Sequence, residues 1–210
     1  MYEVIPGVLE KTWEEVEEKI KLLSPFATSL HIDIADGIAA NNTTFLDPIP
    51  FTKYKDKFFL EVHMMVEEPI KYLKPFARAG FKRFLGNIEK MSSQEEFVAQ
   101  GQLLGEVGLS LDGPTPLEAI VVPYDDLDVV HFYVSEKMGF AGPPMMPERL
   151  EKVKALRAKH STIPIEIDGG VKDTTIGLAK EAGATRFVAT SFISYAPDPQ
   201  KAYLTLKNLI

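Results

Sequence analysis

The chain contains no cysteine, and this absence removes two kinds of site at once. No disulfide can form, and no thiolate can serve as a metal ligand or a nucleophile. Long hydrophobic runs are also missing, since no stretch approaches eighteen uncharged apolar residues, so a membrane span is not expected. The N-terminal residues MYEVIPGVLEKTWEE have neither the basic start nor the apolar segment of a signal peptide.

Basic residues are also fewer than acidic residues. Lys and Arg total 23 against 30 Asp and Glu, giving a formal net charge of −7, which disfavours nucleic acid as a partner. The 210 residues, 45% of them hydrophobic, suffice for one sizeable core, and no linker or low-complexity tract divides them. We therefore expect one domain over residues 1–210, in a soluble cytoplasmic protein.

What the chain does have is a regular alternation of strand-like and helix-like segments. Apolar or β-branched runs occur near residues 2–6, 28–34, 58–64, 82–86, 107–111, 128–134, 163–168 and 185–190. Helices are expected at Trp13–Leu23, Pro69–Ala79, after Ser93, at Pro147–His160 and at Asp173–Ala182. This α/β alternation predicts a parallel sheet. Eight strands favour closure into a (β/α)₈ TIM barrel, with an open doubly wound sheet as the alternative.

Three of the predicted strands carry polar residues on one face only. His31 and Asp33 alternate with aliphatic residues, and so do Glu61 with His63 and Glu166 with Asp168. In a barrel the aliphatic face would meet the helices and the polar face would line the interior. Active sites of such barrels lie at the C-terminal ends of the strands, where several of these residues fall.

The polar residues of these three strands include a donor set for a divalent metal. Each residue alone has an ordinary explanation as a cap or a hydrogen-bonded core group, but their convergence indicates a site. The predicted ligands are His31, Asp33, His63 and Asp168. Two imidazoles and two carboxylates suit Zn, Fe, Mn or Co, and the sequence does not select among them. His131 is expected to have a packing or hydrogen-bonding role in its strand.

Turns follow the last three predicted strands, and two of them, MGFAGPP (138–144) and DGGV (168–171), are rich in glycine, whereas the third is ATSF (189–192). Such turns offer backbone N–H groups to an anion, and barrel phosphate sites commonly lie after strands seven and eight. The turns therefore point to a phosphorylated substrate. The candidate phosphate and substrate residues are Gly139, Phe140, Ala141, Gly142, Gly169, Gly170, Thr190 and Ser191.

Four segments together resemble the signature segments of the ribulose-phosphate 3-epimerase family. They are HIDIADG (31–37), EVHMMVEEP (61–69), MGFAG (138–142) and IEIDGGV (165–171). The resemblance runs from Pro6 to about Pro199. It implies a divalent metal on the four predicted ligands, a phosphorylated ketose as substrate, and association into a homo-oligomer.

The resemblance also implies a reaction. Asp33 and Asp168 would be the acid and base that interconvert ribulose 5-phosphate and xylulose 5-phosphate from opposite faces of the sugar. Inverting a carbon beside a carbonyl passes through an enediolate, whose negative charge a metal can stabilise. One aspartate must then be protonated while the other is ionised. No redox cofactor is needed, and no nucleotide-binding fingerprint occurs.

The chain departs from the family pattern around the substrate. Gly7 stands where the family has a substrate-holding serine, and Ala35 replaces a methionine. Lys137 and Met138 stand near the family's Asn-Pro pair, Ala141 replaces a glycine, and the usual Gly-Ser pair is Thr190-Ser191. A histidine of the fourth strand is also missing from Gly86-Asn87-Ile88-Glu89.

These departures leave alternatives open. The substrate is then D-ribulose 5-phosphate or a related ketose phosphate such as allulose 6-phosphate. A lyase or decarboxylase of this barrel type would carry a D-x-K-x-x-D run, and the comparable HIDIAD run has no lysine. A non-catalytic paralogue that binds a phosphosugar is the third interpretation.

Overall fold

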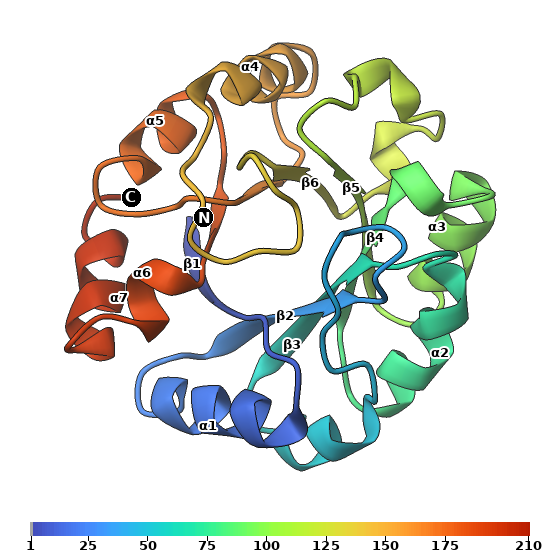
Figure 1. The fold of residues 1–210 in the computed structure, drawn as a ribbon. Helices are drawn as coiled ribbons and strands as arrows, with labels where there is room; N and C mark the ends of the chain where they lie inside the picture. Colours follow the sequence, from blue (N-terminus) through green and yellow to red (C-terminus); the bar gives the residue numbers. More distant parts are fainter. Residues whose placement is uncertain (1) are drawn as a thin grey trace.

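The computed structural model describes residues 2–210. Eight parallel strands pair in sequence order and close into a barrel through β1 and β8 (Figure 1). The strands are β1 (Glu3–Val8), β2 (Ser29–Ala35), β3 (Phe59–Met65), β4 (Arg83–Asn87), β5 (Glu106–Leu111), β6 (Val129–Tyr133), β7 (Ile165–Asp168) and β8 (Arg186–Ala189). Each predicted strand overlaps one of these. The (β/α)₈ barrel is confirmed, and the open sheet is excluded.

Helices surround the barrel as an outer ring (Figure 1). They are α1 (Trp13–Leu23), α2 (Ile70–Arg78), α3 (Gln94–Gln102), α4 (Leu150–Lys159), α5 (Ile176–Glu181), α6 (Ser191–Ser194) and α7 (Pro199–Lys207). Short 3₁₀ turns lie at Ile49–Tyr54, Ile88–Lys90, Leu117–Ala119, Tyr124–Asp126 and Pro147–Arg149. Among residues 2–210, no helix combines the length and the apolar character needed to cross a membrane.

Side-chain hydrogen bonds cap the start of α1, α3 and α7. The predicted capping box starts α1, because Thr12 Oγ1 accepts from the Glu15 N–H and Glu15 Oε2 accepts from the Thr12 N–H. Ser93 caps α3 in the same way, through the Glu96 N–H.

Two helix starts were predicted incorrectly, and two helices, α6 and α7, were not predicted. α5 begins at Ile176 rather than Asp173, because the Thr175 hydroxyl accepts from the Lys172 N–H and donates to the Gly170 carbonyl, holding residues 170–175 in a turn. Pro147–Arg149 forms a 3₁₀ turn ahead of α4. The prediction did not include α7, although Asp198 and Pro199 form its cap and first residue.

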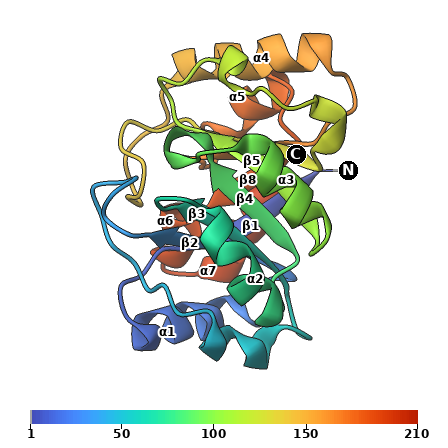
Figure 2. The same ribbon diagram turned by 90° about the vertical axis from the view of Figure 1, so that its right-hand side faces the viewer.

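The apolar core lies between the strands and the helix ring. Leu30 and Ile32 of β2 belong to one buried cluster with Val16, Ile20 and Leu23 of α1. The barrel interior is different in kind, since it holds buried polar residues from several strands. This confirms that the strand alternation sorts aliphatic residues outward and polar residues inward. The loops after β2 and β6 project from the end of the barrel opposite the N-terminus, which is where the strands end (Figure 2).

Candidate active site

One pocket opens at the C-terminal ends of the strands. It is lined by residues of the strand ends and of the loops that follow them. Both predicted catalytic residues, Asp33 and Asp168, line it. So do all eight predicted substrate residues: Gly139, Phe140, Ala141, Gly142, Gly169, Gly170, Thr190 and Ser191. The sequence did not point to five other lining residues: Leu9, Met65, Tyr133, Val171 and Val188.

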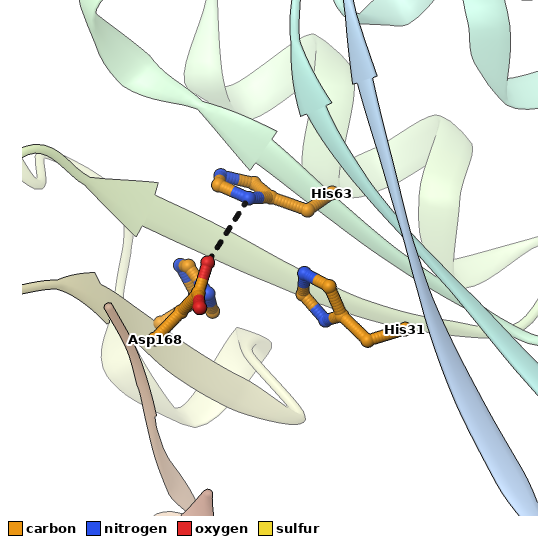
Figure 3. Close-up of side chains that lie close together, drawn as sticks. His31, His63 and Asp168 are labelled. Carbon is orange, nitrogen blue, oxygen red and sulfur yellow. Dashed lines mark ion pairs between the residues drawn. The ribbon is translucent and has the colours of Figure 1, made fainter. Parts of the chain in front are cut away.

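The four predicted ligands converge directly below this pocket. Asp33 Oδ1 lies 3.3 Å from His31 Nε2 and 3.0 Å from His63 Nδ1. Asp168 Oδ2 lies 4.0 Å from His63 Nδ1, and Figure 3 shows His31, His63 and Asp168 pointing toward one another. Tetrahedral bonds of about 2.1 Å would separate ligand atoms by about 3.4 Å. The three separations are close to this value, but the group of ligand atoms that all lie within 4.8 Å of one another consists of His31, His63, His131 and Asp168 and does not include Asp33.

The outer nitrogen of each histidine is anchored. His31 Nδ1 lies 2.7 Å from Glu61 Oε1, and His63 Nε2 lies 2.6 Å from Asn87 Oδ1. A neutral ring that keeps its proton on the outer nitrogen presents a lone pair inward, and such outer partners orient metal ligands. Asn87 belongs to the segment 86–89, from which the histidine of the family pattern is missing, and it supplies this anchor as an amide.

A third imidazole was not expected to belong to the site. His131 is fully buried in the barrel interior, and its ring centroid lies 4.3 Å from that of His63. Ligand atoms of His31, His63, His131 and Asp168 all lie within 4.8 Å of one another. The hydrogen-bonding role that was predicted for His131 is present, because His131 Nδ1 lies 2.8 Å from Ser110 Oγ. The alternation argument used for the other strands would have placed His131 inside the barrel.

The two aspartates have opposite protonation tendencies. Burial by itself would raise the pKa of Asp33, but the charge and hydrogen bond of His31, followed by those of His63, lower it to about 2. Burial raises the pKa of Asp168 to about 7, and the negative charge of Asp33 adds to that effect. One carboxyl is therefore ionised at neutral pH while its neighbour readily holds a proton.

A buried charge network lies beneath the cluster. Arg83 forms an ion pair with Glu61, and its Nε donates to Glu106 Oε2 at 2.8 Å. Glu166 lies farther away, with its Oε2 3.9 Å from Arg83 Nη1. Burial raises the pKa of Glu166, and the charge of Glu61 raises it further. Because Glu61 also contacts His31, this network supports one of the predicted ligands from below.

The glycine loops are shaped by their neighbours. Gly169 and Gly170 have φ of 99° and 71°, a region that favours glycine. A Cβ on either residue would come within 3.0 Å of Ser135 or Met145, respectively, so the turn fits closely against the loop after β6. That loop is itself fixed, because the Tyr133 hydroxyl donates to the Lys137 carbonyl at 2.5 Å and contacts the Phe140 carbonyl at 3.2 Å.

Comparisons with known proteins agree with this geometry. Residues 3–194 match the family described as the ribulose-phosphate 3 epimerase family. The chain belongs to this family. The ribulose-phosphate 3-epimerase of Synechocystis sp. is 33% identical over 98% of this chain and 93% of the relative. The cytoplasmic isoform from Oryza sativa subsp. japonica is 32% identical over 99% of this chain and 93% of the relative.

A solved structure supports the fold. The 3-keto-L-gulonate-6-phosphate decarboxylase from Vibrio cholerae has a TM-score of 0.72 at 13% identity, covering 100% of this chain and 97% of that one. At this identity the likeness shows the fold alone. Membership of the epimerase family confirms the resemblance carried by the four signature segments and the expected isomerase class. It also favours that class over the lyase alternative.

Proposed function

We propose that this protein is an epimerase that inverts C3 of a phosphorylated ketose, most simply converting D-ribulose 5-phosphate to D-xylulose 5-phosphate. The observation that carries the proposal is the pair of buried carboxylates, Asp33 and Asp168, which line one pocket with opposite protonation tendencies. Inversion beside a carbonyl needs one group to accept a proton and another to return one on the opposite face. The pair meets both needs.

Asp33 and Asp168 come from well-separated strands, β2 and β7. We assign ionised Asp33 as the base that accepts the C3 proton in one direction. Protonated Asp168 then donates a proton to the other face of the same carbon, and the two exchange roles in the reverse reaction. Both side chains are almost fully buried, which limits exchange of these protons with bulk water.

The donor set would hold a divalent metal through His31, Asp33, His63 and Asp168. When bound, such an ion supplies positive charge that stabilises a developing enediolate. Zn, Fe, Mn and Co all accept this set. The chain's own contribution is orientation, since Glu61 and Asn87 fix the two imidazoles from behind.

The glycine loops would hold the phosphate. No Lys or Arg is among the residues that line the pocket in the described part of the chain. Backbone N–H groups at Gly142, Gly170 and the neighbouring turns are therefore the donors we assign to the phosphate oxygens. We also propose that the protein forms a homo-oligomer, as its family resemblance implies, which light scattering in solution tests directly.

A coupled assay of the metal-loaded protein with ribulose 5-phosphate and allulose 6-phosphate tests the function. Asp168→Asn should lower kcat by about 10²-fold or more, because it removes the proton carrier. Asp173→Asn, at an exposed aspartate five residues downstream, is the matched control and should retain full activity.

Three results would separate the interpretations. Turnover of allulose 6-phosphate alone would identify a substrate-shifted paralogue. Turnover of neither ketose phosphate would indicate the non-catalytic paralogue. An Asp168→Asn variant as active as the wild type would reject the assigned chemistry.

A further inference from the structure

Gly7 lies inside β1, where the backbone gives no reason for a glycine. Its φ is not in the left-handed region, and a glycine weakens a strand unless something approaches it closely. Gly7 pairs in register with His31 of β2. Since neighbouring residues in register share a face, a side chain at position 7 would point into the barrel, toward the predicted metal ligands.

Thr190 explains the glycine. A Cβ built on Gly7 would come well within 3.0 Å of Thr190 Oγ1, 3.1 Å from Thr190 Cβ and 3.3 Å from Val188 Cγ1. β8 pairs with β1 to close the barrel, which brings these residues together although they lie near opposite ends of the sequence. The Thr190 hydroxyl therefore occupies the space that a side chain at position 7 would fill. Gly7 and Thr190 are two of the positions where the chain departs from its family, and the structure shows that they form one feature.

The Thr190 hydroxyl has no partner within the protein. Among residues 2–210, no backbone or side-chain group forms a hydrogen bond with Thr190 Oγ1. The residue is half-buried, and it lines the pocket together with Asp33 and Asp168. A hydroxyl held in place by a neighbouring glycine, and left unpaired at a pocket wall, is available to a ligand.

We infer that Thr190 Oγ1 binds an oxygen of the substrate's carbon chain, and that Gly7 is the positioning residue that makes room for it. The inference rests on the proposed function and deepens it. We assign the phosphate to a different part of the pocket. Gly142, Gly170 and Ser191 continue into an adjoining hollow that contains Lys172 and does not include Thr190. Thr190 instead lies beside Gly7 of β1, the residue that pairs with His31 on the other edge of that strand.

Calorimetric binding of ribulose 5-phosphate and of inorganic phosphate tests this assignment. Thr190→Val keeps the shape but removes the hydroxyl, so it should weaken ribulose 5-phosphate binding about three- to tenfold. Inorganic phosphate should bind Thr190→Val and the wild type equally. Thr190→Ser, which keeps the hydroxyl, should bind ribulose 5-phosphate within about twofold of the wild type. Unchanged ribulose 5-phosphate affinity in Thr190→Val, or an equal loss for inorganic phosphate, would overturn the inference.

Moving the hydroxyl from position 190, after β8, to position 7 of β1 provides a second test. Gly7→Ser alone should bind ribulose 5-phosphate more weakly, because its side chain displaces Thr190. Gly7→Ser combined with Thr190→Gly should recover affinity, since the space is freed and a hydroxyl is supplied from β1. If the double variant binds ribulose 5-phosphate no more tightly than Gly7→Ser does, a hydroxyl at position 7 does not replace the one at position 190, and the inference is contradicted.

The inference and the proposed function can fail separately. A wild type that binds ribulose 5-phosphate with this Thr190 dependence but does not turn it over refutes the epimerase and keeps the inference. If the wild type turns over ribulose 5-phosphate and Thr190→Val binds it with unchanged affinity, the inference is refuted and the epimerase is kept. A wild type that binds no ribulose 5-phosphate refutes both.

Discussion

Replacing Arg83 tests whether the buried charges below the site depend on one another. Arg83→Met keeps most of the volume but removes the guanidinium that neutralises Glu61. Both side chains of this ion pair are almost fully buried, at 4% and 0% exposure. Removing one partner of such a pair costs about 3–5 kcal/mol, because it leaves a buried charge uncompensated. The contact with Glu106 adds less than about 1 kcal/mol, since that side chain is 39% exposed.

A loss of this size is a large share of the roughly 5–15 kcal/mol that stabilises a folded domain. Urea unfolding at pH 7 measures it. Lys154→Met, which removes the partner of the exposed Glu151, is the matched control and should cost less than about 1 kcal/mol. If Arg83→Met destabilises the protein no more than Lys154→Met does, Glu61 does not carry a buried charge that needs Arg83.

The pH dependence of the free energy of unfolding tests the same prediction independently. Burial would raise the pKa of Glu61, but Arg83 and His31 lower it to about 2. A carboxylate with a lowered folded-state pKa stabilises the protein above its ordinary pKa, and that contribution is lost as the pH falls toward the lowered value. In Arg83→Met the lowering is largely removed. The stability difference from the wild type should therefore shrink below about pH 4.5.

Two further predictions concern the pocket. Metal affinity should fall below pH 7, by at most about tenfold per pH unit, because burial raises the pKa of Asp168 to about 7 and a proton then competes with the metal for this carboxyl group. Calorimetry in buffers of different ionisation enthalpy measures this, and a flat profile from pH 6 to about 8 would contradict it. Tyr133→Phe should raise KM for ribulose 5-phosphate about tenfold while changing kcat little, because it frees the Lys137 and Phe140 carbonyls that fix the loop. Steady-state kinetics decides this, and a fall in kcat at constant KM would place Tyr133 in the chemical step instead.

Periodicity was enough to predict the barrel and much of the site. The alternation of polar and aliphatic residues in three strands placed His31, His63 and Asp168 on the inner face, and the structure confirms that placement. The turns at the ends of β6, β7 and β8 line the pocket as expected. Both predictions rest on short-range pattern together with one rule of barrel architecture.

What the sequence missed depends on contacts between distant strands. His131 was predicted to have a packing or hydrogen-bonding role, because the alternation argument was not extended to its strand, and its proximity to His63 and Ser110 shows that it belongs to the cluster. The pairing of Gly7 with Thr190 arises from closure of β1 on β8, which no local pattern encodes. Asn87 could be named as a departure from the family, but its hydrogen bond to His63 required the structure.

Closure of the barrel at Gly7 and Thr190 also restricts the order in which this site can change during evolution. A serine at position 7 that arises first meets Thr190 in the same space and damages the pocket. A glycine at position 190 that arises first meets no such obstacle, and a serine at position 7 can follow. A change from glycine at position 7 and threonine at position 190 to serine and glycine therefore passes through glycine at both positions. Reconstructed intermediates along the family tree should carry glycine at both positions, and not serine with threonine.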